Sequence, residues 1–208
     1  GLDAMRVPLT PAYFRAISEA HVELDPTAFL SENRKIGVTF REQIFYPLFA
    51  EDPRSFVWIY LAQGVLAGYV AATENVEDFY RRLKGYRPFL LGSLIVKAAL
   101  KNPGILIKYV SSAIKLEQSF STMPIRAEIL SLGVLPRFRT AEFERNLRTS
   151  VAQSLFDKTV EIFRGQGVSQ FKVMTLQENH AANRFYEKQG CRLAATTQPF
   201  GRPCNVYV

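Results

Sequence analysis

The segment that most limits the possible fold is residues 55–73, SFVWIYLAQGVLAGYVAAT, which is rich in β-branched and aromatic residues. Such residues favour strands, and Gln63-Gly64 divides the segment into two runs of strand length. Short runs separated by a glycine-containing pair are typical of a β-hairpin. We therefore expect two antiparallel strands, at 55–62 and 65–73.

The remaining segments alternate between helical and strand patterns. A second near-continuous apolar run, at 126–136, suits a central strand covered on both faces. We expect a mixed α/β sheet flanked by helices, in one domain over residues 1–208 with a helical insertion at about 80–118. The expected helices cover about 10–24, 39–50 (interrupted at Pro47), 88–101, 103–118, 150–165 and 179–190, and the later strands cover about 168–175, 192–198 and 204–208.

The charge is concentrated in one segment. The formal net charge is +7, and residues 80–118 carry eight basic residues against the single acid Glu117. This segment accounts for the whole excess, which argues against a general nucleic-acid-binding surface. In it Lys101, Lys108 and Lys115 recur every seven residues. We expect a basic stripe beside an apolar face made of Ile105, Leu106, Val110, Ala113 and Ile114.

Two explanations of this stripe remain open. The insertion either packs on the core with solvated lysines, or it makes peripheral contact with an anionic membrane or an acidic acceptor. Neither helical run reaches the length of uncharged apolar chain that crosses a bilayer.

The two cysteines, Cys191 and Cys204, have no metal-type spacing and are too few for a disulfide framework. We expect no metal and a reducing compartment. The first residues lack the charged and apolar regions of a signal peptide, so a cytoplasmic location is expected.

Glu128 is a carboxylate in the apolar run at 126–136. Because side chains alternate along a strand, we expect it to share a face with Leu130, Leu132 and Val134. A carboxylate there either finds a cationic partner or has its ionised form disfavoured, which suits a general base. The alternative is a glutamate at the strand end that pairs with Arg126 or another base and faces solvent.

The helix that begins near Ser150 follows a strand, and the free N–H groups of its first turn favour an anion such as phosphate. The connecting segment has no glycine but carries several arginines, which bind phosphates well. A solvated loop explains them equally well. These arginines are Arg137, Arg139, Arg145 and Arg148.

The segment NHAANRFYEKQG, residues 179–190, reads as a short amphipathic helix. Asn179 is a normal N-cap, Gly190 a normal residue after a helix, and Phe185 a core residue. Tyr186 is ambiguous between packing and catalysis.

Together these segments resemble the GNAT superfamily of acyl-CoA-dependent N-acyltransferases. The run AEILSLGVLP is similar to the family's fourth strand, and the later helix to its signature N-x-x-A-x-x-x-Y-x-x-x-G-F. Asn179, Ala182, Tyr186 and Gly190 fall at the signature positions, with Cys191 in place of Phe. The resemblance implies a mostly antiparallel sheet with splayed central strands.

The resemblance also implies a site. The backbone of Leu132, Gly133 and Val134 would bond to the pantetheine arm, and Asn179 and Ala182 would contact the cofactor. Glu128 would be the general base, and Tyr186 would protonate the departing thiolate. Pyrophosphate would sit at the N–H groups of Ser150, Val151 and Ala152. There the family's loop glycines are replaced by Ser150 and Ala152, so Arg148 or Arg145 would compensate.

The implied function is an acetyl-CoA-dependent N-acetyltransferase that acts on a primary amine, with an amino sugar as one suggested acceptor. A second hypothesis is a non-catalytic acyl-CoA-binding sensor or interaction module, because the expected loop glycines are missing. The sequence is compatible with a monomer or a homodimer.

Overall fold

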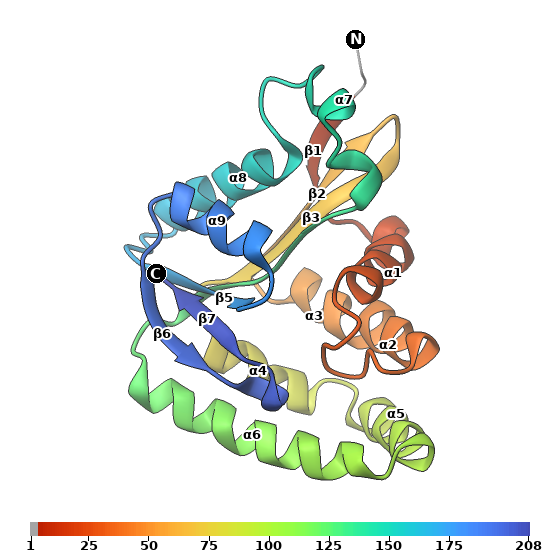
Figure 1. Cartoon of the computed structure of the whole chain (residues 1–208). Coiled ribbons are helices and arrows are strands. Elements are labelled where there is room, and N and C mark those ends of the chain that lie inside the picture. The colour runs from red at the N-terminus through yellow and green to blue at the C-terminus, as the bar shows by residue number, and fades with distance from the viewer. Residues whose placement is uncertain (1–3) are drawn as a thin grey trace.

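The computed structural model describes residues 4–208, apart from the side chains of residues 119–122 and 200. Residues 1–3 of the expected domain lie outside this range. Seven strands form one sheet in the order β1-β2-β3-β4-β5-β7-β6 (Figure 1). The strands are β1 (Ala4–Pro8), β2 (Ser55–Ala62), β3 (Val65–Thr73), β4 (Ala127–Val134), β5 (Phe171–Leu176), β6 (Leu193–Thr197) and β7 (Cys204–Tyr207).

Neighbouring strands are antiparallel except β4 and β5, which are parallel. Helices cover both faces of the sheet (Figure 1), so the expected mixed, mostly antiparallel α/β architecture is confirmed. The α-helices are α1 (Phe14–Leu24), α2 (Arg34–Phe40), α3 (Tyr46–Glu51), α4 (Val76–Gly85), α5 (Pro88–Lys101), α6 (Gly104–Thr122), α7 (Ala141–Glu144), α8 (Val151–Gly165) and α9 (His180–Lys188). Short 3-10 turns lie at η1 (Pro11–Tyr13), η3 (Pro136–Phe138) and η4 (Pro199–Gly201).

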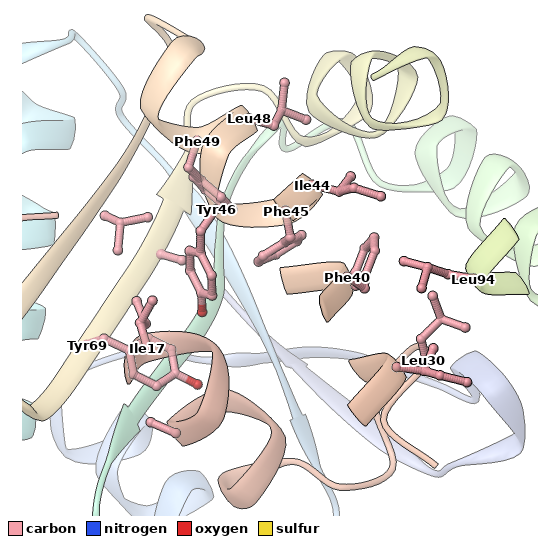
Figure 2. Close-up of a cluster of buried hydrophobic side chains, with 14 of the residues drawn as sticks. Ile17, Leu30, Phe40, Ile44, Phe45, Tyr46, Leu48, Phe49, Tyr69 and Leu94 are labelled. Atoms are coloured by element: carbon pink, nitrogen blue, oxygen red, sulfur yellow. The ribbon is translucent and has the colours of Figure 1, made fainter. Parts of the chain in front are cut away.

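Two buried clusters lie on the two faces of the sheet. The first is rich in aromatic residues and joins α1–α6 to β2 and β3. Figure 2 shows Tyr46 beside Tyr69 of β3 and Ile17 of α1, with Phe45 and then Phe40 further from them on the side of Leu94. The second cluster joins α8 and α9 to the other face, through residues such as Phe156 and Tyr186. The strands therefore separate two helical layers.

The helix expected at 39–50 differs from the one observed. The helical stretch already begins at Arg34, passes through a π-helical segment, η2 (Arg41–Phe45), and continues as α3. Pro47 does not interrupt it, because the proline lies in the first turn of α3. A wider π turn just before it accommodates the missing proline N–H.

A β-bulge in β4 corrects the predicted face of Glu128. Ala71 pairs with Ser131, but the next residue of β3, Ala72, pairs with Ile129, which leaves Leu130 unopposed. An extra residue in one strand interrupts the alternation of side chains. Leu132 therefore packs in the second cluster with Ile129. Glu128 does not share its face with Leu132 and Val134, as strict alternation predicted.

The expected lysine stripe is also wrong. Lys101 is the last residue of α5, whereas Lys108 and Lys115 lie in α6. Lys108 turns toward the segment between α1 and α2, where its Nζ lies 3.0 Å from Glu32 Oε1. Ile105 is buried against the first cluster and does not belong to an outer face. The turn between the two helices breaks the seven-residue spacing.

In the described part of the chain, no helix is long and apolar enough to cross a membrane.

Gly68 sets how closely α8 approaches the sheet. A Cβ atom at this position of β3 would lie 2.9 Å from Val151 Cγ1 and 2.9 Å from the backbone oxygen of Gly133. We predict that Gly68→Ala lowers the free energy of unfolding by about 1–3 kcal/mol, because the added methyl overpacks this contact. Urea unfolding measures the change.

The matched control is Gly92→Ala in α5. A Cβ there meets nothing within 4 Å, so alanine should stabilise the helix by up to about 1 kcal/mol. Equal effects of the two substitutions would contradict the close approach of α8 to Gly68.

Candidate functional site

The candidate site lies where β4 and β5 separate. Their parallel pairing joins Ala127, Glu128 and Ile129 to Phe171, Lys172 and Val173, and it ends there. Beyond this point β4 carries the bulge at Leu130 and continues beside β3, while β5 continues beside β7. The backbone of residues 130–134 is thus left without a β5 partner. Beyond these three pairs the two strands are not paired with each other, and we call the region between them the opening.

Glu128 belongs to the middle one of these three pairs, one residue before the opening. It is only 7% exposed, and its Oε2 lies 3.7 Å from Nζ of Lys172, which is also 7% exposed. Lys172 sits directly opposite it in β5. Arg126, the alternative partner, pairs instead with Glu77, at 3.0 Å. The alternative is therefore wrong in that Glu128 does not face solvent: it is a buried carboxylate whose basic partner is Lys172 rather than Arg126.

Burial raises the pKa of Glu128 to about 7, although the ammonium of Lys172 works in the opposite direction. Desolvation disfavours the charged carboxylate more than this single cation favours it. Burial also raises the pKa of Tyr80 in α4, and the carboxylate of Glu128 adds to that rise. Both predicted outcomes occur together: the carboxylate has a cationic partner, and its ionised form is still disfavoured.

A group of polar side chains that sequence reasoning missed lies on the same face as Glu128. The hydroxyls of Tyr69 and Ser131 are hydrogen-bonded at 3.0 Å, and Tyr46 Oη lies 2.7 Å from Nδ1 of His21. Burial holds the pKa of His21 well below its ordinary value, so the ring is neutral. No motif signals this group, because its members come from α1, α3, β3 and β4.

Gly133 has a packing role beside this group. A Cβ atom there would lie 2.7 Å from Leu24 Cδ1 and 3.0 Å from Tyr69 Cε1. The missing side chain lets the end of α1 and the ring of Tyr69 cover β4 directly.

The α8 N-terminus matches the expected cap. The Ser150 side chain accepts a hydrogen bond from Gln153 N at 3.1 Å, and Val151 is fully buried. The connection from β4 contains η3 and α7. All four of its arginines, including Arg145 and Arg148, are exposed, and none has an ion pair with a described residue. Arg137 stacks on Phe138, with its Cζ atom 4.9 Å from the ring centroid.

Helix α9 begins as predicted. Asn179 caps it by accepting a hydrogen bond from Ala182 N at 3.1 Å. Tyr186 is 4% exposed, and its ring packs near those of Phe156 and Tyr207. Burial raises the pKa of Tyr186, so its hydroxyl keeps its proton at neutral pH. The structure places Tyr186 in the core, with Phe185 only partly buried beside it.

Asn183, which sequence reasoning missed, holds α9 to the sheet. Its Nδ2 donates to the backbone oxygens of Leu176, Gln177 and Asn179, and its Oδ1 accepts from Thr175 and Asn205. Its spacing in the sequence could have identified it, because Asn183 lies one turn before Tyr186 on the buried side of the helix. Gln153 and Gln189 exchange two amide hydrogen bonds, at 2.8 and 2.6 Å, which join the start of α8 to the end of α9.

Two arginines hold the segment between α1 and α2, on the face of the sheet opposite α8 and α9. Arg41 is 2% exposed and donates to the backbone oxygens of Gly37 and Phe29. Arg202, just after η4, pairs with Asp25 at 3.1 Å and contacts Thr27. The Nε atoms of both arginines are buried, and neither has a hydrogen-bond partner among the described residues. These contacts join the β6–β7 connection to the end of α1.

Among the residues that the structure describes, no group of His, Cys, Asp and Glu could hold a metal ion.

Comparison with known proteins places the fold. No protein-family model matches the chain, and no curated protein matches it. Among solved structures, Arabidopsis thaliana NAA60 in complex with acetyl-CoA is 14% identical, with a TM-score of 0.60, over 98% of this chain and 96% of that one. The PaiA N-acetyltransferase from Thermoplasma acidophilum, in complex with coenzyme A, is 9% identical, with a TM-score of 0.57 over 98% of both chains.

The ribosomal-protein-S18-alanine N-acetyltransferase from Escherichia coli is 11% identical, with a TM-score of 0.55, over 98% of this chain and 91% of that one. The chain therefore has the GNAT acetyltransferase fold, and the resemblance seen in the sequence is confirmed at the level of the fold.

The raised pKa of Glu128 has a consequence for stability. Its folded pKa of about 7 exceeds its ordinary value of 4.5, so the folded state binds this proton more tightly. The resulting stabilisation is complete below pH ~4.5 and is lost as the pH rises through ~7, a change of roughly 3 kcal/mol. We predict that Glu128→Gln removes this fall, measured by urea unfolding at several pH values across that range.

The control is Glu178→Gln, an exposed glutamate outside the site, which should keep the fall in stability with pH. An unchanged pH dependence in Glu128→Gln would contradict the raised pKa.

Proposed function

We propose that this protein is an acetyl-CoA-dependent N-acetyltransferase that transfers an acetyl group to an amine by direct attack. The observation that carries the proposal is Glu128, a buried carboxylate whose pKa is about 7, at the point where β4 leaves β5. A carboxylate with this pKa exists in both protonation states near neutral pH, which suits a general base. The N-acetyltransferases of the same fold supply the reaction class.

The donor would lie in the opening between β4 and β5. The backbone of Leu132, Gly133 and Val134 lacks a β5 partner, so its polar groups can bond to the amides of the pantetheine arm. The pyrophosphate of the donor would be held at the start of α8, by the N–H groups of Val151 and Ala152. Ser150 and Ala152 carry side chains that limit the approach of phosphate. The exposed Arg148 would compensate for this by direct contact with the phosphate, and Asn179 and Ala182 would contact the same cofactor.

Glu128 and Tyr186 lie on opposite faces of the sheet. Glu128 is on the face of Tyr80 and α4, whereas Tyr186 is in the cluster of α8 and α9. An amine that enters beside Glu128 therefore meets the acetyl group from one side, and the sulfur departs on the other. This arrangement separates the base from the acid.

The reaction then balances as follows. The amine nitrogen attacks the thioester carbonyl carbon and forms a C–N bond, while its proton passes to the carboxylate of Glu128, directly or through water. The C–S bond breaks, and the thiolate receives the hydroxyl proton of Tyr186, whose raised pKa keeps it protonated beforehand. Lys172 limits the rise of the Glu128 pKa, so that part of the carboxylate is ionised at neutral pH.

The acceptor class is a small-molecule amine, and an amino sugar is the class that the basic helical segment suggests. The alternative function is a non-catalytic acyl-CoA-binding module, which the absence of glycine before α8 favours.

Binding of acetyl-CoA is the first test. At a hundred times its dissociation constant, acetyl-CoA should stabilise the chain by roughly 2.7 kcal/mol, and calorimetry gives the affinity directly. We predict that Arg148→Ala weakens binding about tenfold, because a charge-assisted contact to phosphate is lost.

Arg34→Ala, an exposed arginine in α2, is the matched control and should not change the affinity. Tight binding without turnover of any amine would favour the non-catalytic alternative. An absence of binding would refute the proposed function.

Steady-state kinetics test the two roles. We predict that the rate of the unchanged protein rises through pH ~7 as Glu128 ionises. Glu128→Gln should lose this rise and fall about a hundredfold above pH ~7, where the carboxylate of the unchanged protein is ionised. Tyr186→Phe should lower kcat by a similar factor, because the thiolate must leave without its proton donor.

The variant Lys172→Met tests whether Glu128 acts as the base or has only a structural role. Because Lys172 lowers the pKa of Glu128, its loss should move the rise in rate to higher pH. Unchanged pH profiles in both Glu128→Gln and Lys172→Met would refute the assignment of the base.

A further inference from the structure

The outer side of the α5–α6 hairpin exposes large apolar side chains. Phe89 is 93% exposed, Leu100 81% and Ile107 77%. We call this set the outer apolar face; its members are Phe89, Val96, Leu100, Ile107, Val110 and Ile114. Outside the hairpin, the described chain has only scattered exposed apolar side chains of this size, at Met5, Val65, Met174 and Leu193. Concentration of such residues on one surface marks an interaction site.

The outer apolar face is exposed although the hairpin is packed against the rest of the protein. Leu94 and Ala98 of α5 and Ile105 and Tyr109 of α6 are buried against the first cluster. At 3.6 residues per turn, these residues lie opposite the outer apolar face on each helix. Each helix is therefore apolar on two sides, and the core explains only one of them.

The hairpin is fixed in position. The hydroxyl of Tyr109 donates to Glu32 Oε2 and accepts from Leu30 N, both at 3.0 Å. Lys84 pairs with Glu117 at 2.8 Å, which ties α4 to α6. In Figure 1, α6 runs along one side of the molecule beside α4 and the β6–β7 end of the sheet. The outer apolar face is thus a property of the folded state.

The charges of the α5–α6 hairpin are almost all basic, and its one acid, Glu117, is paired with Lys84. Lys97, Lys101 and Lys115 are exposed, and none has an ion pair with a described residue. From Phe79 to Leu116 the sequence contains no acidic residue. A lysine beside apolar side chains can lay its methylene stem on an acyl region while its ammonium reaches anionic headgroups.

We propose that the outer apolar face of α5 and α6 docks peripherally on an anionic lipid bilayer. The apolar side chains enter the boundary between headgroups and acyl chains, and Lys97, Lys101 and Lys115 bind the lipid phosphates. A second copy of the chain fits less well. A two-fold dimer that paired this face with itself would bring the lysines of both copies together, and the one acid of the hairpin, Glu117, is already paired with Lys84.

The test is co-sedimentation of the full chain with phosphatidylcholine vesicles, with and without phosphatidylglycerol. The unchanged chain should sediment with the anionic vesicles, and much less with added salt or with phosphatidylcholine alone. Lys97→Glu, Lys101→Glu and Lys115→Glu combined should lower partition by on the order of a hundredfold, since each lysine contributes about fivefold.

Leu100→Ser combined with Ile107→Ser tests the apolar part. Both side chains are exposed, so the melting temperature should be unchanged while partition falls at least about tenfold. The matched controls are Val65→Ser, an exposed apolar residue at the β2–β3 turn, and Lys188→Glu at the end of α9. Both should bind like the unchanged chain.

Three results would overturn the proposal. One is no sedimentation with anionic vesicles. Another is equal binding by the Leu100→Ser/Ile107→Ser variant. The third is a dimer in analytical ultracentrifugation that this variant abolishes, which would make the face an interface between copies. None of these results depends on catalytic activity, so the proposed function stands or falls separately.

Discussion

The arrangement of the site depends on the early end of hydrogen bonding between β4 and β5. Three residue pairs join these strands, and beyond them each strand is paired only with its other neighbour. The bulge at Leu130 lies one residue further along. A bulge increases local twist and bends its strand, so β4 can leave β5 while it stays paired with β3. The backbone groups of β4 beyond the bulge are thereby left without a β5 partner, while the seven strands still form one sheet.

The same position explains the chemistry of Glu128. The last paired residues of β4 and β5 are covered by helices on both faces, so a carboxylate there is desolvated. Lys172 compensates only partly at 3.7 Å, and a partner at direct hydrogen-bonding distance would lower the pKa further. The intermediate distance leaves the pKa of this carboxylate at about 7. Strand separation and pKa are therefore linked, because both follow from where the parallel pairing ends.

Local patterns in the sequence predicted much of the fold. The hairpin at 55–73 and the helix at 88–101 have the expected bounds, since turn residues and prolines mark their ends. The first strand was missed because AMRVP is short and pairs with β2 alone. The helix α4 was missed although Asn75 caps it by accepting from Asp78 N.

The site was predictable only in part. Glu128 stood out as a charge in an apolar run, and Asn179 as a cap. The face of Glu128 could not be predicted, because a bulge is a property of two paired strands rather than of one. Lys172 and Ser131 likewise acquire meaning only through partners distant in the sequence. Roles in catalysis and cofactor binding remain proposals for all these residues.

The amide pair of Gln153 and Gln189 has a consequence for how the site responds to its surroundings. Each amide both donates and accepts, and neither carries a charge. The bonds between α8 and α9 therefore do not change with pH or ionic strength in the range where Glu128 gains and loses its proton. The link between α8 and α9 therefore stays the same while the charge on Glu128 varies.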